Sequence, residues 1–399
     1  ENDKLRESIN KEKLSQLSLN SEEIGESGVV IIGKKGNWSY LNTLLLDENA
    51  IGDKGAMAIG KNITWTKLRT LSLEYNNIGT EGAVSIASNK SWIELSSLRL
   101  GNNQIGDKGA EAIGQNGAWR KLKLLDLHLN NISDTGAVAI GGNTTWIDLE
   151  SLILKNNAIG DKGVIAIAKN ESWTNLKTLM LFQNKIGDEG AIAIASNTTW
   201  IHLEILSLGC NKIGDKGAAA IGKNITWVTL KELNLSKNQI GDEGAESMGS
   251  NTTWTKLIEL NLSDNMIGAQ GMKAIGQNSA WSKLSKLRLF GNKIDDIGAR
   301  WIGSNTSWIN LEYLYLQDNG IGEDGAIRLG ENKIWTKLKT LVLSNNRIGD
   351  GGAIAIASND TLVLLQTLKL DDNEIGEKGA VAIGANSSWG ETHNPFTEF

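Results

Sequence analysis

A single unit of 27 residues repeats along almost the whole chain without an insertion or a deletion. Its landmark is a tryptophan, and Leu362 fills the one unit that lacks it. A fixed period of this length predicts a solenoid, because each unit buries its apolar face only against its neighbours. The landmark residues are Trp38, Trp65, Trp92, Trp119, Trp146, Trp173, Trp200, Trp227, Trp254, Trp281, Trp308, Trp335 and Trp389.

Composition narrows the class of protein further. The chain has 399 residues, more than one compact core usually holds, but a solenoid lengthens without thickening. Its net charge of -6 argues against nucleic-acid binding through a general basic field. We find no run of 18 apolar residues, so we expect no membrane span.

Cysteine usage bears on the compartment. The chain has 1 cysteine, Cys210, and so can form no internal disulfide. This favours a cytosolic setting, including a host cytosol after bacterial secretion, over an extracellular one in which disulfides form. The chain has fourteen Asn-x-Ser/Thr sequons, and most recur with the repeat beside the landmark tryptophan, so we interpret them as structural.

The unit that starts at Leu41 shows how each repeat begins. Leu44 and Leu46 are two residues apart and therefore share one face of a short strand. Asn49 follows at a spacing that recurs in almost every unit, and its amide is expected to satisfy backbone groups where the strand ends. Trp65 closes the unit, and stacking of successive units predicts a buried ladder of indole rings.

The second half of the unit predicts a helix over residues 55–60, with Ala56 and Ile59 on its inner face. Asp53 is suited to cap the helix that follows it. The small residues of this segment suggest that the helix lies very close to the sheet. Asn62 is expected to end the helix in a left-handed conformation.

The recurring pattern is LxxLxLxxNxIGDxGAxAI, as in the segment from Leu95 to Ile113. It resembles the leucine-rich-repeat family, and most closely the ribonuclease-inhibitor-like subclass, which is shared with the sensor arm of cytosolic innate-immune receptors. The resemblance implies an α/β leucine-rich-repeat solenoid, a horseshoe of about 14 repeats. A parallel sheet would line its concave face, and short helices its convex face.

Two features depart from that subclass. The unit of 27 residues is slightly short for it, and the tryptophan is unusual there. Such near-identical tandem units are similar to repeat proteins of intracellular bacteria. We predict an N-terminal cap over residues 1–13, where Leu5 and Ile9 suit a capping helix, a repeat domain over residues 14–389, and a C-terminal tail over residues 390–399.

The residues that vary from repeat to repeat mark the surface that we expect to bind a partner. The strand positions between the leucines point outward, and five of the eight aromatic residues other than tryptophan fall in these slots. Aromatic residues and arginine are common anchors of protein interfaces. The residues predicted to bind a partner are Tyr75, Arg99, Leu124, Asp126, His128, Ile153, Met180, Phe182, Cys210, Arg288, Phe290, Tyr313 and Tyr315.

Arg288 and Tyr315 hold the same slot in adjacent units, which places them close enough for a cation–π contact. The slots carry both signs of charge, so we expect no strong steering of charged partners. The outward helix position, as at Val84 and Ile192, forms a second apolar stripe. Lateral packing between helices explains that stripe, and a convex partner site or self-association stays open as an alternative.

Catalytic and metal-binding patterns are not apparent. His128 and Cys210 lie three units apart, too far for a nucleophile–base pair. Asp126 lies two residues before His128 on the same face, but a His–Asp pair alone is a weak signal for catalysis. The repeated Asp of the Ile-Gly-Asp motif is interpreted as a helix cap rather than as a ladder of calcium sites. We therefore predict no catalytic residue, no metal ligand and no cofactor.

The sequence as a whole predicts a non-enzymatic protein–protein interaction module that binds a protein partner, of unknown identity, through the concave face. We expect a monomer that contacts neither nucleic acid nor membrane. Three alternatives remain. The array suits the targeting arm of a secreted bacterial effector or of an innate-immune-type sensor. A GTPase-activating protein can share the repeat subclass, but these loops carry no insertions. A structural or surface-display role would need only the scaffold.

Overall fold

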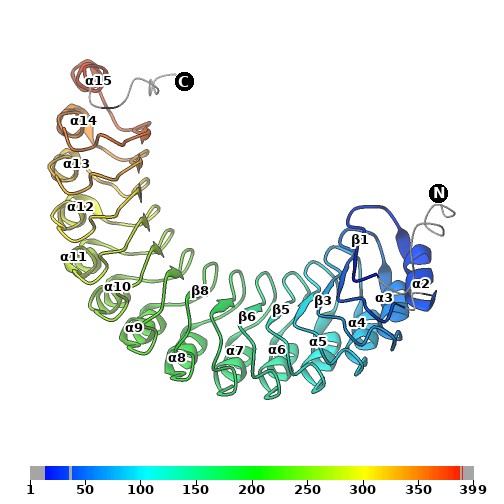
Figure 1. Cartoon of the computed structure of the whole chain (residues 1–399). Helices are drawn as coiled ribbons and strands as arrows, with labels where there is room; N and C mark the ends of the chain where they lie inside the picture. Colours follow the sequence, from blue (N-terminus) through cyan, green and yellow to red (C-terminus); the bar gives the residue numbers. More distant parts are fainter. Residues whose placement is uncertain (1–13, 36–37, 387–388, 390–399) are drawn as a thin grey trace. The chain divides into compact units, whose positions relative to one another are not determined.

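The computed structural model describes residues 14–35, 38–386 and 389, and the chain divides into two compact units. The first unit is Glu1–Ile186 together with Asn197–Leu203, and the second is Gly187–Ser196 together with Glu204–Phe399. Both units have the same construction. In each, the strands lie on one side of the stack and the helices on the other (Figure 1).

The first unit alternates short strands with short helices. Its elements are β1 (Gln16–Ser18), α2 (Gly25–Lys35), β2 (Thr43–Leu45), α3 (Gly52–Gly60), β3 (Thr70–Ser72), α4 (Thr80–Ala87), β4 (Ser97–Arg99), α5 (Gly106–Gly114), β5 (Leu124–Asp126), α6 (Asp134–Gly141), β6 (Ser151–Ile153), α7 (Asp161–Ala168) and β7 (Thr178–Met180).

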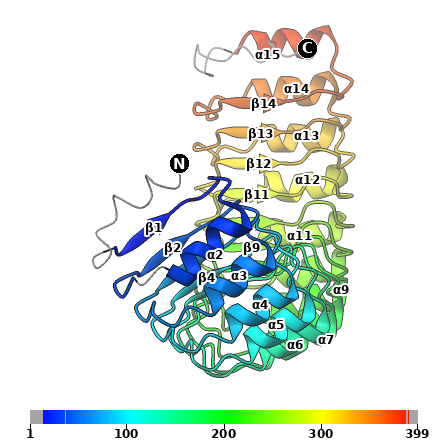
Figure 2. The same ribbon diagram turned by 90° about the vertical axis from the view of Figure 1, so that its right-hand side faces the viewer.

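The second unit continues the same alternation, and Figure 2 shows its strands β11–β14 as successive rungs with helices beside them. Its elements are α8 (Asp188–Ser196), β8 (Ile205–Ser207), α9 (Asp215–Lys223), β9 (Glu232–Asn234), α10 (Asp242–Gly249), β10 (Glu259–Asn261), α11 (Ala269–Gln277), β11 (Lys286–Arg288), α12 (Asp295–Gly303), β12 (Tyr313–Tyr315), α13 (Glu323–Gly330), β13 (Thr340–Val342), α14 (Gly349–Ala357), β14 (Thr367–Lys369) and α15 (Glu377–Gly384).

Within each unit, every strand pairs in parallel with the strand of the next repeat, and the paired residues are one period apart. Leu71 of β3, for example, pairs with Leu98 of β4, and Leu260 of β10 pairs with Leu287 of β11. The expected solenoid of strand–helix repeats is therefore confirmed. Because the register equals the sequence period, equivalent residues form rows that run across the strands.

The core is a stack of leucines, isoleucines and indoles. The strand leucines, such as Leu98 and Leu100, are fully buried. The landmark tryptophans from Trp65 to Trp335 are no more than 1% exposed, as predicted. Neighbouring rings stack, with centroids 6.1 Å apart for Trp38 and Trp65. Burying so large a ring in nearly every repeat supplies much of the hydrophobic stabilisation available to one layer of strands packed on one layer of helices.

A second ladder, of asparagines, lies where the strands end. The Asn76 amide donates to the carbonyl oxygens of Leu46 at 2.8 Å and Glu74 at 2.9 Å. Its Oδ1 accepts the Asn49 N–H at 2.8 Å. The side chain thus satisfies backbone groups of its own repeat and of the preceding one, as the sequence predicts.

The helices are packed more closely against one another than the sequence analysis assumed. The small residues are needed mainly between adjacent helices rather than between helix and sheet. A Cβ on Gly60 would lie 2.5 Å from the backbone carbonyl of Ser85 in the next repeat. The inner positions Ala56 and Ile59 are fully buried, as predicted. Most repeats therefore hold glycine at this position, and the others hold alanine, as at Ala87 and Ala168, because only the smallest residues fit where adjacent helices meet so closely.

The repeated aspartates cap helices, but each caps the helix of the following repeat. Asp53 Oδ1 accepts the N–H groups of Gly79 and Gly82, both at 2.8 Å, at the start of α4. The same contact recurs from Asp107 to Ser133 and Gly136. The prediction that Asp53 caps the helix of its own repeat was therefore wrong. Capping between repeats instead couples each helix to its neighbour.

The prediction for Asn62 was wrong in its geometry. Its φ is not positive, and its amide donates to the carbonyl of Gly33 in the preceding repeat at 2.8 Å. Its Oδ1 accepts the N–H and the hydroxyl of Thr64, both at 2.8 Å. This is the geometry of an Asx turn, and it explains why a hydroxyl residue follows at the second position. The buried, hydrogen-bonded amide supports the structural interpretation of these sequons.

The two ends of the array are less regular. Leu362 is 2% exposed and fills the tryptophan position, while Trp389 is only half-buried. The predicted N-terminal cap over residues 1–13 and the tail over residues 390–399 lie outside the described residues.

Candidate functional site

The outward slots of the strands and of the turns just after them form a continuous surface in each unit, which we call the strand face. In the first unit, Arg99, Asp126, Ile153 and Met180 lie in one row, because they are paired in register across β4, β5, β6 and β7. The sequence-predicted residues of this unit therefore do lie on one face. They are Tyr75, Arg99, Leu124, Asp126, His128, Ile153, Met180 and Phe182.

Exposure differs among these predicted residues. Tyr75 and Arg99 are exposed, and Leu124, Ile153, Met180 and Phe182 are half-buried. Asp126 and His128 are only 5% and 7% exposed. The prediction of a surface pair was wrong, because the two side chains are buried and hold each other.

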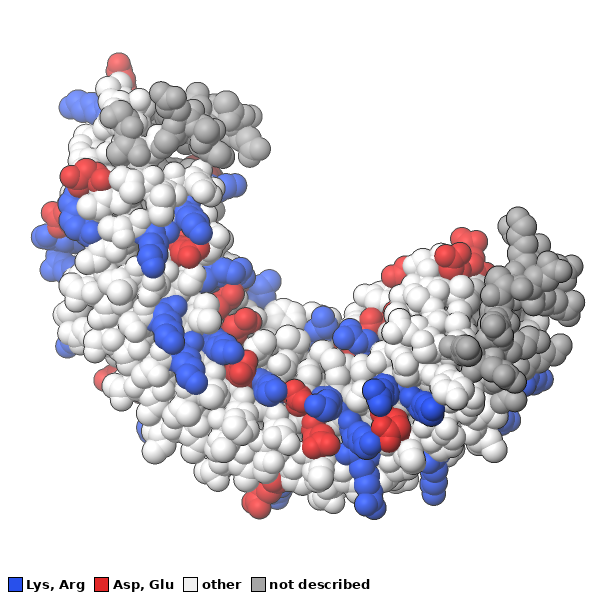
Figure 3. Space-filling model, in the orientation of Figure 1, with Lys and Arg blue, Asp and Glu red and all other residues white. Residues whose placement is uncertain are grey.

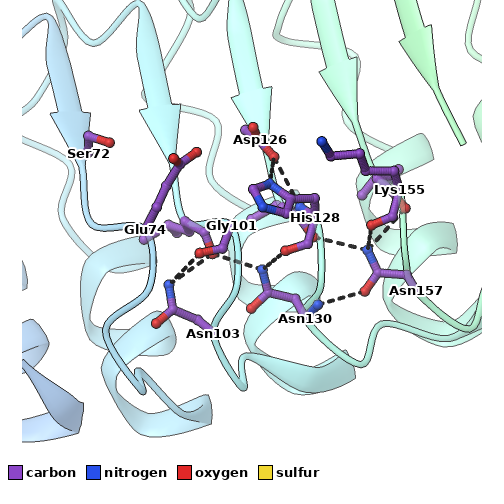
Figure 4. Close-up of polar contacts among 12 residues, drawn as sticks. Ser72, Glu74, Gly101, Asn103, Asp126, His128, Asn130, Lys155 and Asn157 are labelled. Carbon is purple, nitrogen blue, oxygen red and sulfur yellow. Dashed lines mark hydrogen bonds and ion pairs between the residues drawn. The ribbon is translucent and has the colours of Figure 1, made fainter. Parts of the chain in front are cut away.

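Asp126 and His128 belong to a polar cluster that the structure completes with Glu74 (Figure 4). Asp126 Oδ1 lies 2.8 Å from His128 Nδ1 and also accepts the backbone N–H of His128 at 3.0 Å. One ligand-type atom from each of Glu74, Asp126 and His128 lies within 4.8 Å of the others. Glu74 comes from a repeat two units earlier and was not among the residues predicted from the sequence.

Burial and nearby negative charges shift the pKa of the Glu74 carboxyl. Burial raises the pKa of the Glu74 carboxyl above its ordinary value, and the charges of Asp126 and Asp47 raise it further. His128 and Arg99 oppose this shift of the pKa. Asp47 itself is engaged, because its Oδ1 accepts the Ser72 hydroxyl at 2.6 Å and the Glu74 N–H at 2.8 Å.

Gly101 makes room for the His128 ring. It occupies the slot between Glu74 and His128 in the same row, and a Cβ there would overlap the imidazole at Cε1 and Nδ1. The ring therefore lies across the intervening repeat, toward the side from which Glu74 comes (Figure 4). The sequence shows a glycine in this slot, but nothing in the pattern indicates which side chain would cover it.

Two bulky residues flank this cluster in a strained backbone conformation. Tyr75 has φ of 57° and Leu129 has φ of 51°, and their side chains are 47% and 41% exposed. The equivalent position is Asn102 in the repeat between them, a residue type that tolerates this conformation. The Tyr75 ring meets the His128 ring edge-on at 6.2 Å. Leu129 was not among the predicted residues, because only the backbone shows that its position is left-handed.

The second unit presents a different group. Arg288 and Tyr315 are paired in register, and the guanidinium lies 5.5 Å from the centre of the tyrosine ring, so the predicted cation–π contact is confirmed. Lys286 lies 5.5 Å from the ring of Tyr313 in the same way. Glu259 ties the two cations together, at 3.1 Å from Lys286 and 3.6 Å from Arg288.

Phe290 and Cys210 are the remaining predicted residues of this unit. Both are half-buried and follow their strands, β11 and β8. Burial raises the pKa of the Cys210 thiol, which lowers its reactivity at neutral pH. His128 and Cys210 belong to different compact units.

Charge is mixed on the surface, as expected from the sequence. Basic and acidic side chains are interspersed in each unit on the face that Figure 3 presents. Many form pairs between adjacent repeats, such as Glu150, which lies 2.9 Å from Lys123 and 2.7 Å from Lys177. These pairs hold the pKa of the Glu150 carboxyl below its ordinary value.

The apolar stripe on the helices is also visible. Val84, Val138 and Ile192 are between 37% and 47% exposed, so lateral packing covers each side chain only in part. Among the described residues, no helix has both the length and the apolar character needed to cross a bilayer.

Comparison with known proteins identifies the repeat. Thirteen segments match the family model described as Leucine Rich repeat, over residues 39–60, 66–87, 95–114, 120–141, 147–168, 174–195, 201–222, 228–249, 255–276, 282–302, 309–330, 336–357 and 363–384. The chain belongs to the leucine-rich-repeat family. Leucine-rich-repeat proteins generally act as scaffolds for protein–protein interaction.

Solved leucine-rich-repeat structures share the fold. An internalin of Listeria monocytogenes is similar over 98% of this chain and 93% of its own, with 21% identity and a TM-score of 0.62. A leucine-rich-repeat protein of Leptospira interrogans is similar over 94% of each chain, with 20% identity and a TM-score of 0.58. No curated protein is significantly similar to the chain in sequence.

A plant receptor also resembles the chain in fold. The ectodomain of the Arabidopsis receptor kinase HAESA, solved with a peptide hormone ligand, is similar over 91% of this chain and 58% of its own, with 19% identity and a TM-score of 0.50. At these identities the likenesses concern the arrangement of repeats alone.

Proposed function

We propose that this leucine-rich-repeat chain is a non-enzymatic module that binds a protein partner through the strand face. The observation that carries the proposal is the pair Tyr75 and Leu129, which are bulky, exposed and left-handed on that face. The equivalent position has a positive φ in every repeat from Ser21 to Asp372, so the turn itself imposes this backbone, and the other repeats hold glycine, cysteine or a polar residue there. A bulky apolar side chain kept at such a position costs conformational energy. An exposed aromatic or branched apolar side chain beside a polar cluster is typical of a residue that anchors a protein interface.

The tyrosines of the second unit support the same proposal. Tyr313 and Tyr315 are held by Lys286 and Arg288, each cation lying 5.5 Å from a ring centre. A ring that is already held in place loses little conformational freedom when a partner covers it. Tyrosine and arginine are also enriched among residues that dominate binding energy.

The experiment first identifies a partner and then measures its affinity for variants. Wild-type chain captures the partner from lysate, mass spectrometry identifies it, and interferometry measures Kd. Tyr75→Asn removes one ring while keeping a residue that tolerates the left-handed backbone. The double variant Tyr313→Ala with Tyr315→Ala removes the second group.

Tyr40→Ala is the matched control, because Tyr40 is 52% exposed, much like Tyr75, but lies outside the strand slots. Loss of a buried interface anchor weakens binding by about tenfold or more. We expect such a loss in at least one of the strand-face variants and an unchanged Kd in the control. Equal binding by all these variants would show that the partner uses another surface.

The polar cluster does not by itself indicate an enzyme. The Ser72 hydroxyl, on β3, donates to Asp47 and not to His128. Asp126 and His128 are buried, so a substrate would have little access to them. The proposal therefore assigns no reaction to this chain.

We also infer the repeat subclass and the cellular setting of the chain. The helix in every repeat supports the ribonuclease-inhibitor-like subclass, and the near-identical tandem units support an origin among bacterial repeat proteins, including the targeting arm of a secreted effector. The mixed charge of the surface favours a protein partner over a nucleic acid. A monomer in a reducing compartment fits the single cysteine.

A further inference from the structure

The strand face of the first unit gathers three residues with metal-ligating side chains. Glu74 follows β3, while Asp126 and His128 belong to β5 and the turn after it. One oxygen or nitrogen from each lies within 4.8 Å of the other two. Among the described residues, this is the one group of three such side chains that close together.

The geometry depends on the repeat between them. Strands two repeats apart are separated by roughly 9–10 Å, twice the ordinary strand spacing, so side chains there do not usually meet. Gly101 removes the side chain that would stand between them, and the His128 ring lies over it. Figure 4 shows Glu74 and His128 on the two sides of Gly101.

The three candidate ligands differ in their exposure and in their hydrogen bonds. The side chains of Asp126 and His128 are 8% and 9% exposed and hold each other at 2.8 Å. The Glu74 carboxylate accepts no hydrogen bond from the part of the chain that the structure describes, although its backbone N–H donates to Asp47. Glu74 therefore has both oxygens available for a cation.

Local charge favours a cation as well. Asp47 and Glu74 hold the same slot in adjacent repeats, Asp126 comes from two repeats after Glu74, and the nearby cations in these rows are Arg99 and Lys155. This leaves an excess of one negative charge when the imidazole is neutral. A buried or half-buried group with unbalanced charge is stabilised when an ion of opposite charge enters.

We propose that Glu74, Asp126 and His128 bind one divalent transition-metal ion, with Zn²⁺ as the best-suited ion. One imidazole nitrogen with two carboxylate oxygens is a donor set that zinc accepts. If Nδ1 is the ligand, the ion replaces the proton that lies between His128 and Asp126, and that proton is released to solvent. Three protein ligands leave a fourth position for water or for a group of a bound partner.

The test uses untagged full-length chain from which metal has been removed with a chelator. Isothermal titration with zinc chloride gives stoichiometry and affinity, and Co²⁺ absorption in the visible range reports the coordination of the ion. We expect one ion per wild-type chain. Glu74→Gln is the decisive variant, because the Glu74 side chain is half-exposed and its loss leaves the Asp126–His128 pair intact.

Glu74→Gln and His128→Gln should each weaken zinc binding at least tenfold and abolish the Co²⁺ bands. His202→Gln is the matched control, because His202 is an exposed histidine elsewhere in the first unit, and it should bind zinc as the wild type does. Circular dichroism confirms that each variant is folded. If His128→Gln does not fold, Glu74→Gln still decides the question.

Absence of zinc binding by the wild type would overturn the proposal. So would an unchanged affinity in Glu74→Gln, because the ion would then bind elsewhere. Neither measurement involves a protein partner, so the outcome is independent of the binding function proposed above.

Discussion

At the scale of single residues, Gly101 determines whether the polar cluster of the first unit can form. The row to which it belongs carries Glu74 before it and His128 after it, and the imidazole fills the space above the glycine. Any side chain at position 101 would compete with the ring for that space. The arrangement shows how one small residue lets two distant repeats share a site.

Gly101→Ala is therefore predicted to destabilise the chain by about 1–3 kcal/mol, the usual cost of forcing extra volume into a packed site. Urea unfolding followed by circular dichroism measures this difference. Gly117→Ala is the control, because a Cβ there would make only an ordinary contact at 3.7 Å with Thr145. A change of the same size in both variants would mean that the imidazole is not packed over Gly101.

At the scale of the element, each helix depends on an aspartate from the repeat before it. Asp107 Oδ1 accepts the Ser133 N–H at 2.7 Å and the Gly136 N–H at 3.0 Å, and Oδ2 accepts the Ser133 hydroxyl at 2.5 Å. Burial alone would raise the pKa of the Asp107 carboxyl. The hydrogen bonds from Ser133 and Gly136 outweigh it, so the pKa lies below its ordinary value.

This lowered pKa has a defined consequence for stability. Because the folded pKa lies below the unfolded pKa, the contribution of Asp107 is fully present above about pH 4, the ordinary aspartate value, and is lost as the pH falls through the folded pKa. Asp107→Asn keeps an oxygen that can accept the two N–H groups, but it removes the charge and the second oxygen, which accepts the Ser133 hydroxyl. We predict that it costs about 1 kcal/mol at pH 7, the usual size of a lost hydrogen bond.

Denaturant unfolding of wild type and Asp107→Asn between pH 7 and pH 2 measures the difference. It should shrink as the pH falls below about 4, because the wild-type carboxyl then becomes neutral as well. A matched control is Asp148→Asn, an aspartate outside the capping position. A difference that stays constant with pH would show that the charge of Asp107 does not contribute.

At the scale of the whole molecule, one period governs every contact between neighbouring repeats. Strand pairs, asparagine bonds and aspartate caps all join residues 25 to 30 positions apart. Stability in such an array is close to a sum of repeats and of the interfaces between them. A complete repeat should therefore be removable without disturbing the contacts of the others.

Deletion of residues 257–283, one period within the second unit, is predicted to leave a folded chain with unchanged helical signal per residue. After the deletion, β9 and β11 have matching partners, because Leu233 and Leu287 hold the same position in their repeats. Deletion of residues 257–280 removes three residues fewer and should abolish cooperative unfolding, because leucines and slots no longer align. Circular dichroism and thermal unfolding distinguish the two. Equal behaviour of the two deletions would contradict control by the period.

The sequence by itself determined the solenoid, the strand leucines, the buried tryptophans and the asparagine ladder. Because the period recurs without gaps, each recurring residue must lie beside its equivalent in the next repeat. It also predicted the contact between Arg288 and Tyr315, since equal slots in adjacent repeats are one strand spacing apart.

Only the tertiary structure decided which helix Asp53 caps, how Asn62 bonds, and that Glu74 meets His128 across Gly101. These contacts depend on where a side chain turns once its neighbours are packed, and the repeat pattern treats every unit alike. The left-handed backbone at Tyr75 and Leu129 was also decided by the tertiary structure. The residue type at this position varies from repeat to repeat, so the sequence does not reveal the conformation, which the turn after each strand imposes.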